Sequence, residues 1–420
     1  MNFNINYYQN KIMSESQKEK FFLKQDIEYF KNEDVKDKNV SKQNFKSLVE
    51  RNSTRKSENS TKHNSIGRKI ESYKKILIKY ILIFYLINAI CANIRLAPAI
   101  LNSSKINVKI KGIGNGCIYY KDFVQKPDEI NINGEKQVYI KNEYYLNQSE
   151  NYVELIWDTP LTNCSQMFKE CSKILEIDLS NFDSSNVKTI ESMFYEYSSL
   201  TSINLTNFDT SNVSDMNQLF YSCISLNSID LSSFITSKVN YMYSMFQNCS
   251  SLTSLNLSNF NTSNVKYING MFVSCSSLIS LDLSNFNTSN VKNINSMFAR
   301  CYSLISLNIS SFDTSQVTNM AGMFYGCNLL TSLDLSNFDT SNVYIMGNLF
   351  VNCYSLKFVN LSSFNTKKSI FMYNMFYNCS SLTSLDLANF DLSNVNNTRN
   401  MFYNCSSLTS LDISHFDTSN

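Results

Sequence analysis

Phenylalanine returns at the same place every 26 residues through most of this chain, and no other feature limits the fold as strongly. Two such rows keep their register without an insertion or a deletion. Periods of 20 to 50 residues are typical of solenoids, in which each unit buries its apolar side against its neighbours. The first row comprises Phe168, Phe194, Phe220, Phe246, Phe272, Phe298, Phe324, Phe350, Phe376 and Phe402, and the second comprises Phe182, Phe208, Phe234, Phe260, Phe286, Phe312, Phe338, Phe364, Phe390 and Phe416.

The two halves of one repeat have different periodicities. Leu281 and Leu283 flank Asp282 with the period of two of a strand, so we expect the leucines to point inward and the aspartate outward. In the second half, spacings of three between apolar residues predict a short helix or successive helical turns. These residues are Val291, Ile294, Met297, Phe298 and Cys301. Residues 161–420 are therefore predicted to form an α/β solenoid of about ten coils, the last of which is incomplete. Since the chain stops in the middle of that repeat, we expect it to be a fragment.

The segment before the repeats divides into a polar tail and an apolar stretch. Residues 1–75 carry 17 Lys and Arg against 10 Asp and Glu, so the tail has a net charge of +7 and the remaining chain −5. The tail lacks sustained periodicity and is predicted to be disordered. Residues 76–94 read ILIKYILIFYLINAICANI, which as a helix of ~1.5 Å per residue spans ~28 Å, enough to cross a membrane.

Basic residues precede the apolar stretch, which places the tail inside the cell and the repeats outside. The prediction is a single-pass membrane protein anchored through residues 76–94. A secreted protein is the alternative, because Ala97-Pro98-Ala99 resembles a signal cleavage site, although the leader would be unusually long. A third interpretation folds residues 76–94 into the body as a buried helix.

Residues 95–160 contain short β-like runs, NVKIKGI, QVYIKN and YVELIW, separated by turn residues. We expect a small β-rich cap here, because an open solenoid end would expose its core to water. Trp157, the only tryptophan, stands where such a cap would bury it.

Nine of the twelve cysteines also follow the 26-residue period, with Tyr197 at the one missing position. Equivalent cysteines in adjacent coils would lie ~4.8 Å apart, a separation that a disulfide tolerates. However, their side chains would point the same way, whereas a disulfide needs them turned toward each other. We therefore favour buried, reduced thiols that fill the core. The ladder comprises Cys171, Cys223, Cys249, Cys275, Cys301, Cys327, Cys353, Cys379 and Cys405.

Aspartate and asparagine alternate at the outward position between the paired leucines. Nine members alternate before the last, Asp412, breaks the pattern, and the aspartates among these nine are Asp178, Asp230, Asp282, Asp334 and Asp386. Two carboxylates ~4.8 Å apart would repel by ~3.5 kcal/mol at an effective dielectric of 20, so alternation permits an acidic stripe. The stripe is a candidate binding face. Hydrogen bonding between rungs, or duplication of a two-repeat segment, explains the alternation equally well.

Phe358 interrupts a neighbouring outward row that otherwise consists mostly of serine. An exposed aromatic on a polar face is a candidate contact residue, and ordinary drift within a tolerant repeat is the alternative.

The composition argues against catalysis. His63 and His415 are the only histidines, which nearly excludes a Ser-His or Cys-His arrangement and excludes a histidine-rich metal site. No cofactor and no nucleic acid is expected as a partner, because the positive charge is confined to the tail.

The stretch SLTSLNLSNFNTSNVKYINGMFVSCSSL, residues 251–278, resembles the 26-residue leucine-rich repeat of BspA-like surface proteins. The resemblance covers residues 160–420 and implies surface display and adhesion to matrix, cells or polymers, without catalysis. The hypothesis is therefore a surface protein that binds proteins or glycans through the strand face of its solenoid. A coat protein that self-associates without a specific ligand and an intracellular scaffold are the alternatives.

Overall fold

A computed structural model of the chain describes residues 104–141, 143–414 and 416, all within one compact unit, Ala99–Asn420. The tail predicted at 1–75 and the apolar stretch predicted at 76–94 lie outside the described residues. Among the residues that are described, no helix is long and apolar enough to cross a membrane.

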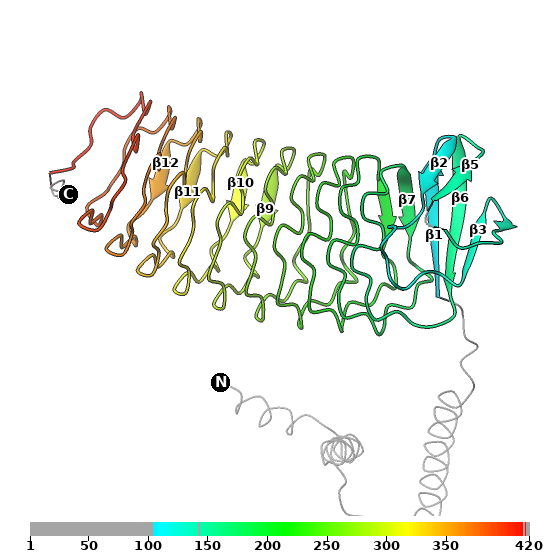
Figure 1. Cartoon of the computed structure of the whole chain (residues 1–420). Coiled ribbons are helices and arrows are strands. Elements are labelled where there is room, and N and C mark those ends of the chain that lie inside the picture. The colour runs from blue at the N-terminus through cyan, green and yellow to red at the C-terminus, as the bar shows by residue number, and fades with distance from the viewer. Residues whose placement is uncertain (1–103, 142, 415, 417–420) are drawn as a thin grey trace, which may run out of the picture. The chain divides into compact units, whose positions relative to one another are not determined.

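A small antiparallel β-structure precedes the repeats and covers their first coil (Figure 1). Within it, β1 pairs with β6 on one side and with β7, the first strand of the solenoid, on the other. The free edge and the core of the first coil are thereby covered. Its strands are β1 (Ser104–Lys111), β2 (Gly114–Cys117), β3 (Glu129–Ile132), β4 (Glu135–Lys136), β5 (Glu143–Leu146) and β6 (Glu150–Trp157).

Trp157 is buried where this cap meets the coils. Its ring meets Phe182 edge-on, with centroids 6.0 Å apart, and its Nε1 donates to the carbonyl of Gln125 at 2.8 Å. A buried indole needs such a partner for its N–H, and the cap supplies it.

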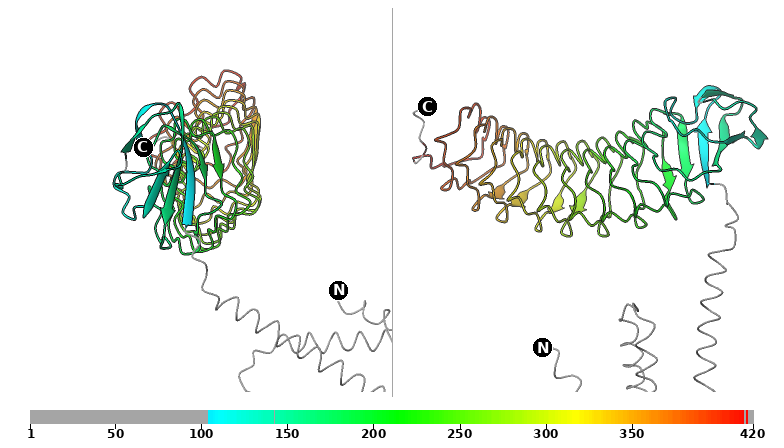
Figure 2. Two further views of the ribbon diagram at one scale, coloured as in Figure 1. Left: turned by 90° about the vertical axis from the view of Figure 1, so that its right-hand side faces the viewer. Right: turned by 60° about the horizontal axis from the view of Figure 1, so that its bottom comes forward.

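The coils follow one another in a single curved row (Figures 1 and 2). Parallel pairing joins β7 to β8, β9 to β10 and β11 to β12. As the period of two predicts, Leu281 and Leu283 are buried and Asp282 is exposed. The solenoid strands are β7 (Ile174–Asp178), β8 (Ser202–Asn204), β9 (Ser280–Asp282), β10 (Ser306–Asn308), β11 (Ser332–Asp334) and β12 (Phe358–Asn360).

The prediction of a helix in the second half of each coil is wrong. The described residues contain no helix, so the fold is a β solenoid and not an α/β one. Consecutive turns occupy this half. Within one of them, Met193 N–H donates to Ile190 C=O at 3.1 Å, and Ser192 between them has a φ of 54°. A left-handed residue at the third turn position is typical of a type II turn and stops a right-handed helix.

Every coil has two such left-handed positions, four residues apart, and Gly or Asn occupies half of them. The first row comprises Gln166, Ser192, Gln218, Ser244, Gly270, Ser296, Gly322, Asn348, Asn374 and Asn400, and the second comprises Glu170, Glu196, Ser222, Asn248, Ser274, Arg300, Gly326, Asn352, Asn378 and Asn404.

These turns point alternate peptide N–H groups at the next coil. Ile294, Ser296 and Phe298 donate to carbonyls 25 residues later at 3.1, 2.9 and 2.9 Å. Because a buried peptide group without a partner is costly, this ladder replaces the hydrogen bonds that a helix would make within itself.

The core consists of stacked rows. Neighbouring rings of the first phenylalanine row, Phe168 to Phe402, have centroids 5.3 to 6.2 Å apart and nearly parallel planes. Burial of each ring contributes roughly 1.5–3 kcal/mol. The repeated phenylalanine thus places one ring of every coil on the ring before it.

A row of buried threonines completes the connection between coils. The Thr288 hydroxyl donates to the Asp313 carbonyl and accepts from the Asp313 N–H, both at 2.8 Å. The hydroxyls of all the buried threonines donate to the carbonyl 25 residues later. They are Thr210, Thr236, Thr262, Thr288, Thr314, Thr340 and Thr366.

Eight cysteines of the predicted ladder are free thiols, seven of them buried and Cys405 partly exposed. Each donates to the carbonyl of a phenylalanine 29 residues earlier at 3.1 to 3.3 Å, and burial raises the pKa of Cys301 and Cys353 to about 12. The eight are Cys223, Cys249, Cys275, Cys301, Cys327, Cys353, Cys379 and Cys405.

The first rung differs from the expectation, because Cys171 forms a disulfide with Cys117 of β2. In later coils the thiol points to a carbonyl of the preceding coil. Cys171 belongs to the first coil, which has the cap in place of a preceding coil, and Cys117 lies there instead. The 26-residue period did not predict this bridge, because Cys117 lies in the cap and outside the repeated positions.

Replacement of Thr288 by valine should destabilise the protein although shape is conserved. The change leaves the Asp313 N–H and C=O without their partner, at about 1–3 kcal/mol for each unsatisfied group. Urea unfolding followed by circular dichroism measures the loss as a lower midpoint. Thr288→Ser keeps the hydroxyl and should stay much closer to the unchanged protein; equal midpoints for the two variants would contradict the proposed role.

Candidate functional site

The predicted acidic stripe lies on the exposed side of the part of each coil that forms or continues the solenoid strands, named the strand segment. Asp282, Asp334 and Asp386 are exposed, and Asp178 is partly exposed. The strand pairs place three of these aspartates beside asparagines, Asp178 beside Asn204, Asp282 beside Asn308 and Asp334 beside Asn360. No two aspartates are adjacent within these pairs.

Each aspartate of the stripe closes a turn at the end of its strand segment. One carboxylate oxygen accepts the peptide N–H two residues later at 2.9 to 3.0 Å, which is the arrangement of an Asx turn. The acceptors are Asp178, Asp230, Asp282, Asp334 and Asp386, and the donors are the N–H groups of Ser180, Ser232, Ser284, Ser336 and Ala388. These carboxylates therefore have a structural role besides any contact with a ligand.

Asparagine serves the same turn in the alternate coils, and its amide adds a bond between coils. Asn204 Nδ2 donates to Asp178 Oδ1 at 2.9 Å, and Asn360 Nδ2 donates to Asp334 Oδ1 at 2.9 Å. Only a neutral amide can donate to the neighbouring carboxylate, which gives the alternation a hydrogen-bonding reason.

The turn also affects protonation. The N–H of Ser284 lowers the pKa of Asp282, with a smaller contribution from the Ser284 hydroxyl, and the same arrangement lowers the pKa of Asp230 and Asp334. Hydrogen bonds to the charged form stabilise it. These carboxylates are therefore ionised at neutral pH.

Phe358 begins β12 and is 54% exposed. Ile279 and Ile305 directly precede β9 and β10 in two earlier coils, and their side chains are 50% and 55% exposed. The N–H of Ile305 donates to the carbonyl of Ile279 at 2.8 Å, so these two residues lie on adjacent coils. Phe358 lies on the second coil after that of Ile305. The three residues, named the strand-face patch, present large apolar side chains where most other coils have threonine or serine.

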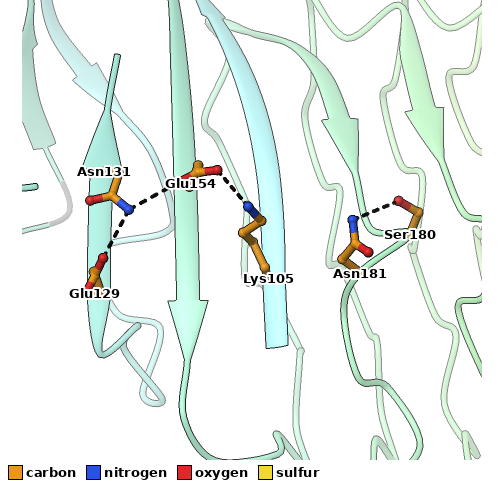
Figure 3. A network of polar contacts seen from close by, with 6 residues as sticks. All are labelled: Lys105, Glu129, Asn131, Glu154, Ser180 and Asn181. Carbon is orange, nitrogen blue, oxygen red and sulfur yellow. Dashed lines mark hydrogen bonds and ion pairs between the residues drawn. The ribbon is translucent and has the colours of Figure 1, made fainter. Parts of the chain in front are cut away.

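The cap carries a network of polar and charged side chains across β3, β6 and β1 (Figure 3). Lys105 Nζ lies 2.7 Å from Glu154 Oε1, and Asn131 Nδ2 donates to both Glu154 and Glu129. The hydrogen bond from Lys105 lowers the pKa of Glu154.

Beside it, Lys109 lies between Glu150 and Glu176 at 3.1 and 3.3 Å, and hydrogen bonds to them, Glu150 first, raise its pKa. A groove of about 550 Å³ borders this lysine. Because the charges are paired with one another across β6, β1 and β7, they join the cap to the first coil.

A second groove, of about 500 Å³, lies between Tyr243 and Tyr325 on the half of the coils that consists of consecutive turns, named the turn segment. This groove was not among the sites predicted from the sequence. Its signal is a gap in a row where tyrosine recurs: Gln247, Val273 and Ala299 stand where Tyr195, Tyr221 and Tyr325 stand in other coils.

Within the range that the structure covers, no group of three or more His, Cys, Asp or Glu side chains could hold a metal ion. His63 and His415 both fall outside the described residues.

We expect stability to fall in acid partly through Asp230, Asp282 and Asp334. Their pKa is lower in the folded state than the ~3.9 of an unfolded chain, so their contribution is present above about pH 4 and is lost as pH falls further. Replacing all three with asparagine keeps the turns, and the urea midpoint should then drop less between pH 7 and pH 3.

The matched control replaces the same three aspartates with alanine. It removes the turn acceptor and should lower the midpoint at both pH values. An asparagine variant with the same acid sensitivity as the unchanged protein would contradict the assignment.

Two family models match the chain. The model described as "Mycoplasma protein of unknown function, DUF285" matches residues 162–278, 252–333 and 328–420, and the model described as "BspA type Leucine rich repeat region (6 copies)" matches residues 100–215. Neither a curated protein nor a solved structure matches it. The first model covers more than half of the chain and coincides with the coils described above. The chain therefore belongs to the DUF285 family and is built from BspA-like leucine-rich repeats.

Proposed function

We propose that this is a non-enzymatic protein displayed outside the cell, which binds a partner protein through the strand face of its solenoid. The observation that carries the proposal is the strand-face patch, Ile279, Ile305 and Phe358, each half exposed. Large apolar and aromatic side chains on a polar surface are typical of interface centres, where burial of a few residues supplies most of the binding free energy.

Three further observations support display outside the cell. The Cys117–Cys171 disulfide suits an oxidising compartment. Seven of the eight remaining ladder thiols are buried and protonated, so they tolerate that compartment without pairing. BspA-type repeats suggest a surface or binding protein. The anchor that we assign to this protein is the apolar stretch at residues 76–94, which lies outside the described residues.

Restoring the common residues of the rows should abolish binding through the patch. In Ile279→Thr/Ile305→Thr/Phe358→Ser, affinity for immobilised extracellular-matrix proteins should fall at least about 30-fold, the loss typical of a binding hot spot. Surface plasmon resonance with purified full-length protein measures it.

Ile224→Ser is the matched control, since Ile224 is 41% exposed but lies outside the strand segment. Equal binding by the triple variant and the control would sink the strand-face proposal. If the unchanged protein instead self-associates at micromolar concentration and the triple variant does not, the patch belongs to a coat protein.

Protease treatment of intact cells tests the display. With antibodies against residues 1–75 and against the repeats, we expect the repeats to be digested and the tail to survive. Survival of both, with digestion of both in permeabilised cells, would place the protein inside and favour the scaffold.

A further inference from the structure

The groove between Tyr243 and Tyr325, named the turn groove, exists because several coils depart from the repeat at once. Tyr195 and Tyr221 stack at 4.5 Å in the coils before it, and Tyr377 and Tyr403 stack at 4.8 Å in the coils after it. Between them the same row carries Gln247, Val273 and Ala299 before tyrosine returns at Tyr325. Three successive coils thus lack the tyrosine ring, two of them with the short side chains of Val273 and Ala299, and this leaves a depression between Tyr243 and Tyr325.

Glycine deepens this depression at two of the left-handed positions. Gly270 and Gly322 stand where other coils carry Ser, Gln or Asn, and both line the turn groove. A Cβ on Gly270 would lie 3.0 Å from Ser244 Oγ, so a side chain there would crowd the neighbouring coil. From the coil of Tyr243 to that of Asn348 the groove crosses four steps of ~4.8 Å, or ~19 Å.

The lining is polar without being acidic. Asn269, Asn295 and Asn348 contribute amides, which both donate and accept hydrogen bonds, and no Asp or Glu lines the groove. The side-chain amide of Asn269 has no hydrogen-bond partner among the described residues. Such groups match a ligand whose hydroxyls donate and accept in turn.

Arg300 is the only charged residue of the lining. It is exposed, and its guanidinium carbon lies 5.9 Å from the centroid of the Tyr325 ring. Across the described part of the chain, no carboxylate forms an ion pair with it. A guanidinium held over a ring and left without an anion can bind a carboxylate through two parallel hydrogen bonds.

We propose that the turn groove binds a linear acidic oligosaccharide. Tyr243 and Tyr325 offer flat faces for the C–H side of sugar rings, the amides between them bind hydroxyls, and Arg300 binds a carboxylate of the sugar. A peptide fits less well, because the groove lacks the deep apolar pocket that an anchoring side chain needs. The inference goes beyond the strand-face proposal and uses a different segment of the coil, so either can fail alone.

The test uses purified full-length protein and isothermal titration calorimetry. The probes are a tetrasaccharide of alternating glucuronate and N-acetylglucosamine and a neutral tetramer of N-acetylglucosamine. We expect the acidic probe to bind at least about tenfold more tightly than the neutral one, since hydrogen bonds between charged groups are stronger than those between neutral ones.

Each variant introduces a residue that the same row already carries elsewhere, so the coils should still fold, which a melting curve verifies. Val273→Tyr/Ala299→Tyr refills the groove and should abolish binding of both probes. Arg300→Asn should remove the preference for the acidic probe and leave binding of the neutral one. Val351→Tyr adds the same side chain one coil beyond Tyr325 and should change neither.

Three results would overturn the proposal. They are no binding of the acidic tetrasaccharide, equal affinity of the refilled variant for it, and binding of a glutamate-rich tetrapeptide in its place. The Ile279→Thr/Ile305→Thr/Phe358→Ser variant should bind the tetrasaccharide normally, which separates this outcome from that of the strand-face proposal.

Discussion

Hydrogen bonds between one coil and the next are the interaction on which the whole solenoid depends. In the turn segment, alternate N–H groups donate to carbonyls 25 residues later, and the hydroxyl of each buried threonine bonds to the residue 25 positions later. Both contacts require every coil to contain the same number of residues. One inserted residue would leave a series of buried peptide groups without partners, which explains why the period of 26 is kept throughout.

Once the coil length is constant, equivalent residues fall on top of one another, and each row must tolerate contact with itself. Phenylalanine rings stack, cysteine thiols donate to the preceding coil, and asparagine donates to the neighbouring aspartate. Carboxylates on every rung would repel, and their alternation with asparagine avoids this. The cap has the different task of ending the rows, through β1 beside β7 and through the Cys117–Cys171 bridge.

Departures from the rows carry the two proposals for function. Ile279, Ile305 and Phe358 add apolar surface where the row has threonine or serine, and Val273 and Ala299 remove an aromatic ring where the row has tyrosine. The shared residues already satisfy the fold, so a coil can change at exposed positions at little cost in stability. Larger side chains form the strand-face patch and smaller side chains leave the turn groove, and the same arrangement of coils supports both sites.

The sequence by itself determined the repeat, its leucine-rich character, the inward leucines and outward aspartates, and the place of Trp157, because each follows from a period that residue identity reveals. Tertiary structure decided the rest. Apolar spacings of three suit a helix and a series of turns equally, and only bonds to the next coil select the left-handed residues that make turns. Likewise, the disulfide between Cys117 and Cys171 and the groove lined by Tyr243 and Tyr325 form only when the cap and the coils stack on one another, which no local pattern encodes.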